Sequence, residues 1–222
     1  APYAVYRTTG GADPPKRIAN ELAATTFDDT GVARTALAFP TTNTTGVVFT
    51  PNGPGRAHLF QDDREFVVEG PIFYEVSKGG TITPRGVVAV DGNPATISSN
   101  GDGGGQLFIT SGNNGYLFTM ATNAFVTVRT GATTMGEQLD GYFIAFDAAT
   151  SKIFLSALLD GATWDATQFA QRSSSSDPWV SMKLLNPYVW LFGTQTSEAW
   201  YNAGTFPFPF ALHPSGRIPH GC

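Results

Sequence analysis

Carboxylate pairs are the first candidates for chemistry in this sequence, because two neighbouring acids can divide the roles of general acid and general base. Glu137 lies three residues before Asp140, and Asp62 is followed directly by Asp63. Each pair lies in a segment typical of turns, where solvated acids are far more common than catalytic dyads. The sequence also contains no Gly-x-Ser-x-Gly, Walker or His-Glu-x-x-His motif. We therefore predict no catalytic residues and expect that the chain is not an enzyme.

A metal site is the second candidate, in the glycine-rich segment that begins at Asn100 and Asp102. A calcium loop needs side-chain oxygens at its first, third and fifth positions and a glutamate at its twelfth. Counted from Asn100, the fifth residue is Gly104 and the twelfth is Ser111, so the segment is interpreted as a turn. The histidines are scattered and lack the paired spacing of a zinc site: they are His58, His213 and His220. We predict neither a metal nor a cofactor.

A third motif, Asp160-Gly161-Ala162-Thr163-Trp164, is close to the aspartate box of sialidase-type propellers, Ser/Thr-x-Asp-x-Gly-x-Thr-Trp. In that box the Asp accepts backbone N–H bonds and the Trp packs into the blade. The Asp-to-Trp spacing here is one residue short. We predict a structural turn formed by Asp160, Thr163 and Trp164, which supports a propeller fold without supporting hydrolysis.

The elements that carry these motifs are indicated by a two-strand cassette that occurs four times. Each copy pairs two apolar, aromatic-rich runs across a polar or glycine-containing turn, and the register marks Phe66, Phe108, Phe143 and Trp190 are separated by 42, 35 and 47 residues. A repeat of about 40–50 residues with four short strands is typical of a β-propeller blade. We predict an all-β, propeller-like fold with four recognisable blades.

The bulk composition agrees with this fold and excludes several classes of protein. Of the 222 residues only 14% are charged, whereas there are 25 Gly and 15 Pro, which favours short strands and tight turns. The net charge is −5 and no basic run is present, so stable binding to DNA is not expected. The only cysteine is the last residue, Cys222, and no apolar run is long enough for a membrane span.

Two regions are expected along the chain. Residues 1–55 resemble an irregular N-terminal arm with a short helix, capped by Asp13 and carrying Ile18 and Leu22, and one strand at 47–49. Residues 56–222 carry the blades, interrupted by a second short helix within 161–172. No strand is expected after the fourth cassette. Four blades make the smallest propeller, and the other interpretation, which we favour, is an incomplete ring continued beyond residue 222 or by another polypeptide.

The stretch from Asp140 to Cys222 resembles the packaged DNA stabilization proteins of short-tailed bacteriophages, which are tail hub or nozzle subunits. The likeness covers roughly 80 residues, with the blades from residue 56 agreeing more loosely. It rests on these segments: Asp140-Gly141-Tyr142-Phe143, the run from Phe154 to Asp165 with Phe169-Ala170, Val189-Trp190-Leu191-Phe192-Gly193, the run from Glu198 to Gly204, and His220-Gly221-Cys222.

This resemblance implies a structural virion protein of the phage tail, assembled in the host cytoplasm. Six copies are expected to form a ring below the portal and adaptor proteins, to contact needle or tail fibre proteins, and to let DNA pass without specific binding. Phe206, Phe208 and Phe210, which alternate with Pro, are the candidate assembly contacts. Two alternatives stay open: a glycan-binding or sialidase-like propeller, and a generic protein-interaction propeller.

Overall fold

The computed structural model describes residues 3–7, 16–22, 53–172 and 176–222. The chain divides into two compact units, Ala1–Phe49 and Thr50–Cys222. The expected strand at 47–49 lies outside the described residues. Each unit is therefore considered by itself.

The N-terminal unit contains a two-stranded antiparallel sheet of β1 (Tyr3–Arg7) and β2 (Lys16–Leu22). The short helix expected around Ile18 and Leu22 is wrong, because β2 occupies this segment. Residues spaced four apart lie on one face of a strand as well as of a helix, so two apolar residues do not distinguish the two. Pairing with β1 shows that this segment is a strand: Val5 pairs with Ala19, and Tyr6 pairs with Arg17.

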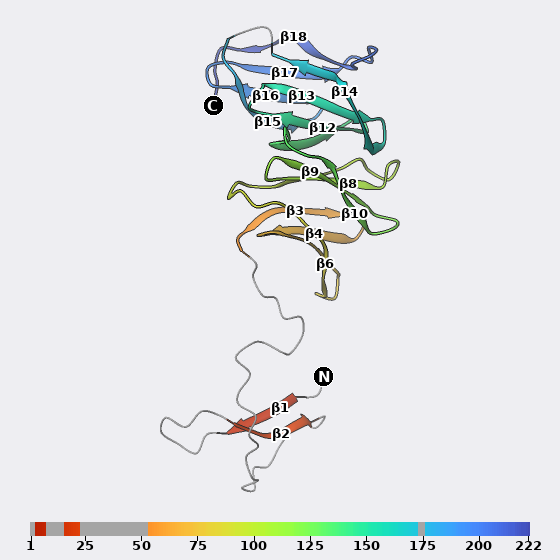
Figure 1. The fold of residues 1–222 in the computed structure, drawn as a ribbon, viewed down its shortest axis with the longest axis vertical. Coiled ribbons are helices and arrows are strands. Elements are labelled where there is room, and N and C mark those ends of the chain that lie inside the picture. Colours follow the sequence, from red (N-terminus) through yellow and green to blue (C-terminus); the bar gives the residue numbers. More distant parts are fainter. Residues whose placement is uncertain (1–2, 8–15, 23–52, 173–175) are drawn as a thin grey trace. The chain divides into compact units, whose positions relative to one another are not determined.

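The second unit consists of four antiparallel sheets of four strands each, which we call blades 1 to 4 (Figure 1). Blade 1 contains β3 (Gly55–Gln61), β4 (Arg64–Glu69), β5 (Ile72–Val76) and β6 (Ile82–Val87). Blade 2 contains β7 (Thr96–Ser99), β8 (Gln106–Ser111), β9 (Asn114–Thr119) and β10 (Ala124–Arg129). Blade 3 contains β11 (Met135–Leu139), β12 (Tyr142–Asp147), β13 (Lys152–Ala157) and β14 (Asp160–Gln171). Blade 4 contains β15 (Trp179–Leu185), β16 (Tyr188–Gly193), β17 (Ser197–Asn202) and β18 (Phe210–Ile218).

Two-residue turns connect several of the consecutive strands within the blades. Gly112 and Asn113 between β8 and β9 both have positive φ, as do Asp140 and Gly141 between β11 and β12. Positive φ at both central residues is the geometry of a type I′ turn, whose twist matches that of the flanking strands. The segment around Gly112 is therefore a tight hairpin turn, and Asp140 lies at a turn rather than on a strand.

Two further expectations for this unit are wrong. The segment 161–172 does not contain a helix, because its residues to Gln171 continue β14, which pairs with β13 through Phe154–Phe169 and Ile153–Ala170. A strand, β18, also follows the fourth cassette and pairs with β17. In both cases the neighbouring strand, β13 or β17, would otherwise be an unpaired edge. Hydrogen bonds to its backbone outweigh the weak local preference of the segment for another conformation. Pro214 is tolerated in β18 because this strand is an edge of its sheet.

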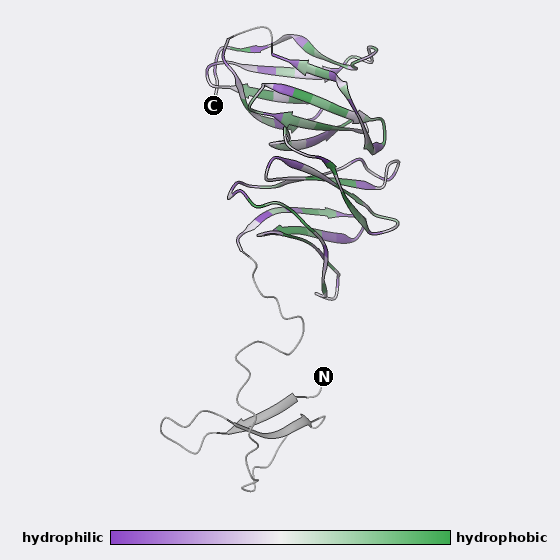
Figure 2. Cartoon of the chain, viewed as in Figure 1, coloured by the Kyte–Doolittle hydropathy of each residue, from purple (hydrophilic) through white to green (hydrophobic). Residues whose placement is uncertain are grey.

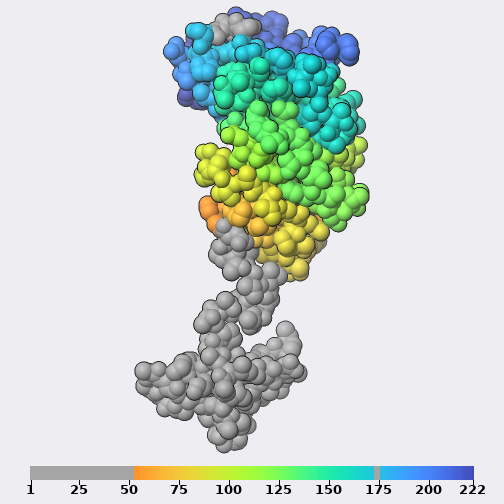
Figure 3. Space-filling model, in the orientation of Figure 1, coloured from red at the N-terminus to blue at the C-terminus, as the bar shows by residue number. Residues whose placement is uncertain are grey.

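The blades follow one another in chain order, with inner strands in contact from β3 to β7, β11 and β15. Blade 1 and blade 4 lie at opposite ends of this row, from orange and yellow to blue in the space-filling view (Figure 3). The middle blades are more deeply buried than the end blade. Strands β8 and β12 of the middle blades are buried almost continuously, whereas β16 of blade 4 alternates between buried and partly exposed residues. The end blades therefore pack on one face, and the described residues form an open row.

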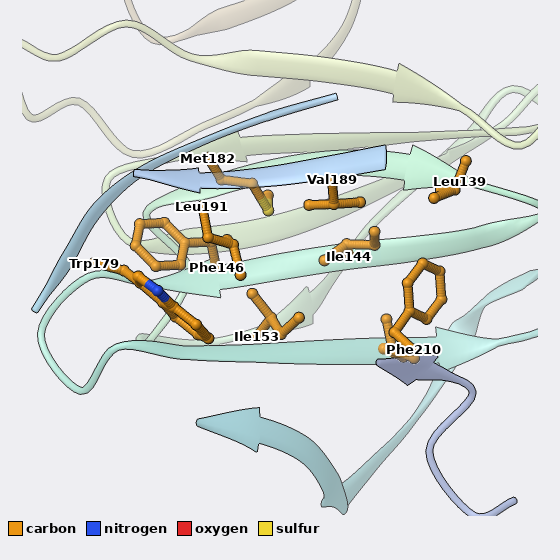
Figure 4. Packing of buried hydrophobic residues seen from close by; sticks show 10 residues of the cluster. Leu139, Ile144, Phe146, Ile153, Trp179, Met182, Val189, Leu191 and Phe210 are labelled. Carbon is orange, nitrogen blue, oxygen red and sulfur yellow. The ribbon is translucent and has the colours of Figure 1, made fainter. Parts of the chain in front are cut away.

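Three separate hydrophobic cores hold the row together. The core between blades 3 and 4 includes Ile144, Phe146 and Ile153 on one side and Trp179 and Leu191 on the other (Figure 4). The core between blades 1 and 2 is built on Phe66, Phe73 and Phe118 with Leu107 and Ile109. The core between blades 2 and 3 is the smallest, with Phe108, Leu117, Phe143 and Ala145. Hydrophobic residues lie along the strands of the blades, interspersed with hydrophilic ones (Figure 2).

Candidate interaction surface

The segment Asp160–Trp164, predicted as a turn, forms the irregular start of β14 and binds blade 3 to blade 2. The Asp160 carboxylate accepts a hydrogen bond from the Ala162 N–H (2.9 Å), and hydrogen bonds led by that from Thr163 hold the pKa of Asp160 below its usual value. The Trp164 Nε1–H donates to the Gly161 carbonyl (2.7 Å), and its ring lies 5.2 Å from that of Phe108 in blade 2. This geometry fastens two blades and offers no reacting group.

A side-chain amide and a stacked cation complete the joint between these blades. The Gly161 N–H donates to the Gln106 Oε1 (2.8 Å), so a side chain of blade 2 holds the start of β14. The Arg129 guanidinium lies 4.5 Å from the ring centroid of Phe154 and 4.8 Å from that of Trp164. Burial lowers the pKa of Arg129 from its usual value. The cation of Arg129 is thus used internally between blades.

The carboxylate pairs singled out in the sequence do not act as pairs. Glu137 accepts a hydrogen bond from the Lys183 ammonium (2.7 Å), whereas Asp140 accepts one from the Asn202 amide (3.1 Å). Asp62 and Asp63 both have positive φ in the turn between β3 and β4. The structure thus places all four in turns or ion pairs.

The candidate metal segment is held by its own side chains. The Asn100 Oδ1 accepts from the Gln106 N–H (2.9 Å), and Asn100 is only 4% exposed. Among the described residues, no group of three or more His, Cys, Asp or Glu side chains could hold a metal ion.

Within the same residues, no helix is long and apolar enough to cross a membrane.

Most arginines of the second unit form ion pairs with carboxylates of the same unit. Arg56 contacts Asp91 at 2.8 Å, and Arg64 and Arg85 both contact Glu75, at 2.7 and 2.6 Å. The Glu75 pKa is held below its usual value, chiefly by the hydrogen bond from Arg64.

The fourth arginine pair is buried. Arg172 contacts Asp177 at 3.0 Å, and both side chains are less than 10% exposed. A sialidase site requires several arginines that converge on one substrate carboxylate. Arg64 and Arg85 do converge, but on the protein's own Glu75.

The three candidate assembly residues separate into two groups. Phe210 is 3% exposed and lies in the core between blades 3 and 4, against which Phe208 also packs. Phe206 is 93% exposed. The alternation with Pro does not put the three rings on one surface, because the chain folds back to start β18 at Phe210. Phe210 is thus closed off from a partner, Phe208 is partly buried, and Phe206 is fully exposed; the role of the three residues as assembly contacts stays a prediction.

Two adjoining hollows lie at the turn end of blades 3 and 4. The first, about 540 Å³, is lined among others by Tyr142, Leu158 and Phe206. The second, about 420 Å³, includes Tyr188. Asp140 and Asn202 belong to both. Sequence reasoning missed this surface, since its shared residues are 62 positions apart and no motif connects them.

Comparison with known proteins decides the family. A family model described as bacteriophage P22 Gp10, beta-propeller, matches residues 22–222. The chain belongs to this phage stabilization family. The resemblance found in the sequence is thereby confirmed, and so is the all-β, propeller-like fold.

Solved structures similar to this phage stabilization propeller show the same fold at low identity. A streptogramin B lyase has a TM-score of 0.55 and 12% identity, over 75% of this chain and 56% of that one. A virginiamycin B lyase from Staphylococcus aureus has a TM-score of 0.51 and 12% identity, over 75% of this chain and 58% of that one. The chain thus spans less than two thirds of these proteins, and the likeness concerns the fold alone. No curated protein matches the sequence.

Proposed function

We propose that this phage stabilization propeller is a structural subunit of the tail of a short-tailed phage. In this proposal, six copies form a ring below the portal and adaptor, prolong the DNA channel, retain the packaged genome and support its ejection. The needle or tail fibre proteins attach to the same ring, which assembles in the host cytoplasm. The observation that carries the proposal is the family match over residues 22–222, which supports a structural and non-enzymatic role in the phage particle.

The charge distribution supports a wall along which DNA slides. The net charge of the chain is −5, and fixed carboxylates repel phosphate over about 8 Å at physiological salt. Arg56, Arg64, Arg85 and Arg172 are in ion pairs, and Arg129 is stacked on two rings. These five arginines are therefore engaged within the protein and are not free for phosphate contacts, which supply most of the affinity for nucleic acid.

The open row supports the further proposal that additional blades complete the propeller, beyond residue 222 or from another polypeptide. Blade 1 carries Phe60 on a strand at the edge of its sheet, 61% exposed. In a closed propeller each blade packs on both faces, as blades 2 and 3 do here. A further blade would therefore cover surface that the end blades leave open.

Negative-stain electron microscopy of the complete native gene product, alone and with portal–adaptor complexes, tests the proposal. We expect rings with a central channel that dock coaxially on the adaptor. Ring formation requires heterologous contacts, in which two different patches meet. Separate small particles that ignore the adaptor would refute the tail-ring function and leave the propeller fold unaffected.

A further inference from the structure

The two hollows at the turn end of blades 3 and 4 form one continuous surface, because Asp140 and Asn202 line both of them. Their volumes are about 540 and 420 Å³, and both are wide open to solvent. We name this surface the Asp140 groove. Its residues come from the β11–β12 turn, the end of β17 and the loop that follows it, together with other strands and turns of blades 3 and 4.

The two residues shared by the hollows of the Asp140 groove are fixed by hydrogen bonds. The Asn202 amide donates to the Asp140 Oδ2 (3.1 Å) and its own Oδ1 accepts from the Gly204 N–H (3.0 Å). The Thr205 hydroxyl donates to the Phe208 carbonyl (2.7 Å). Because Phe208 packs on the core between blades 3 and 4, the loop that carries Phe206 is anchored on both sides. Phe206 is thus held in solvent by a braced loop.

Aromatic rings form the walls of the groove. In the first hollow, the Tyr142 ring is held edge-on against buried Phe210, with centroids 6.0 Å apart, and Phe206 stands at the rim. In the second hollow, the His213 ring lies between those of Tyr188 and Tyr201, at centroid distances of 5.4 and 5.7 Å. Each hollow is therefore lined by aromatic side chains and by the carboxylate of Asp140 and the amide of Asn202.

The charge of the groove selects against anions. Among the residues that the structure describes around the two hollows, there is no lysine or arginine, and Asp140 contributes a negative charge. Phosphate, sialic acid and uronic acid groups would thus meet repulsion without a compensating cation. DNA is excluded as an occupant by the same argument.

We propose that the Asp140 groove binds a neutral oligosaccharide. A pyranose ring presents a face of C–H groups, which packs on aromatic rings, and a rim of hydroxyl groups, which both donate and accept hydrogen bonds. Asp140 accepts from such hydroxyls, while the amides of Gln168 and Asn202 can do both. In this proposal each hollow takes one of two successive sugar units, and both units contact Asp140 and Asn202. This inference does not depend on ring formation.

The test begins with the 222-residue chain on an array of neutral, sialylated and uronic-acid-containing oligosaccharides. Neutral hits are then titrated calorimetrically against the wild-type chain, Phe206→Ser and Asp140→Asn. We expect Phe206→Ser to weaken binding about tenfold, which corresponds to about 1.4 kcal/mol. Asp140→Asn, which keeps the side-chain size and tolerates positive φ, is expected to weaken it several-fold.

Phe60→Ser is the matched control, because Phe60 is also an exposed phenylalanine but lies in blade 1, away from the groove. It should leave sugar binding unchanged. Binding only to anionic glycans, no binding at millimolar neutral glycan, or equal effects of Phe60→Ser and Phe206→Ser would overturn the proposal. The competing occupant is a second copy of the chain: if sedimentation shows a wild-type oligomer that Phe206→Ser dissociates, the groove is a protein contact and the sugar assignment is wrong.

Discussion

Gly136 offers the sharpest test of how blades 2 and 3 pack. A Cβ placed on this glycine of β11 would lie 2.7 Å from two ring carbons of Phe108 and 2.7 Å from the methyl group of Thr110. Ordinary carbon–carbon contacts are about 3.5–4.0 Å, so the neighbours would have to move by nearly 1 Å. Phe108 and Thr110 are both 0% exposed and have little room to do so.

Two opposing effects determine the stability of Gly136→Ala. Replacing a glycine by alanine at a compatible φ stabilises by about 0.4–1 kcal/mol, since the unfolded chain loses freedom. Overpacking a filled core costs about 1–3 kcal/mol. The difference predicts a net destabilisation of about 1–2 kcal/mol, a factor of roughly 5–30 in the folded-to-unfolded ratio.

Gly55→Ala is the control for this prediction. Gly55 lies in β3, its added Cβ would meet nothing within 4 Å, and its φ is not in the left-handed region. Only the entropic gain applies, so this variant should be as stable as the wild type or slightly more so. Urea unfolding followed by tryptophan fluorescence measures both variants, with an unchanged m value as the sign that the same transition is compared. If Gly136→Ala is as stable as Gly55→Ala, the inferred close packing against Phe108 is refuted.

Further predictions concern the cores and the buried acids. Phe118→Ala should cost about 3–5 kcal/mol, and hydrogen exchange should show protection lost in blades 1 and 2 before blades 3 and 4; uniform loss would contradict separate cores. Phe210→Ala should cost a similar amount in urea unfolding, whereas Phe206→Ser should stay within about 0.5 kcal/mol of the wild type. The pKa of Glu75 is lowered, so its ion pairs stabilise the fold above pH 4.5, and this stabilisation is lost as the pH falls below it. Thermal unfolding should therefore show Glu75→Gln less stable than the wild type at neutral pH, by a margin that shrinks on acidification. Glu69, 5% exposed, has a pKa raised by burial, so Glu69→Gln should match the wild type well below pH 4.5 and exceed its stability as the pH rises to 7.

The sequence predicted the central strands of each blade well. The cassettes correspond to the pairs β4–β5, β8–β9, β12–β13 and β16–β17, each of which has a hydrogen-bonded neighbour on both sides. Such strands are buried and carry dense apolar runs, so their pattern is strong. The edge strands β14 and β18 are largely exposed and contain few consecutive apolar residues. Their conformation is imposed by pairing, which local preferences do not reveal.

The candidate surface was predictable only in part. The segment at Asp160 has a local motif, and the structure shows its carboxylate and Trp164 in hydrogen bonds at the irregular start of β14. The Asp140 groove joins turns from two blades, and the exposure of Phe206 depends on where the following residues return to the sheet. Neither property follows from spacing along the chain.

The existence of three interblade cores, rather than one shared core, has a mechanical consequence. Each core joins only two neighbouring sheets, so a force applied along the row is carried by joints in series. The most compliant joint then takes up most of the deformation, while the hydrogen bonds within each sheet stay intact. Blades 2 and 3 share the fewest buried apolar residues, but glycines at 136 and 161 bring the two sheets close together there. Under load, the row can therefore bend at the contacts between blades while the hydrogen-bonded sheet of each blade stays intact.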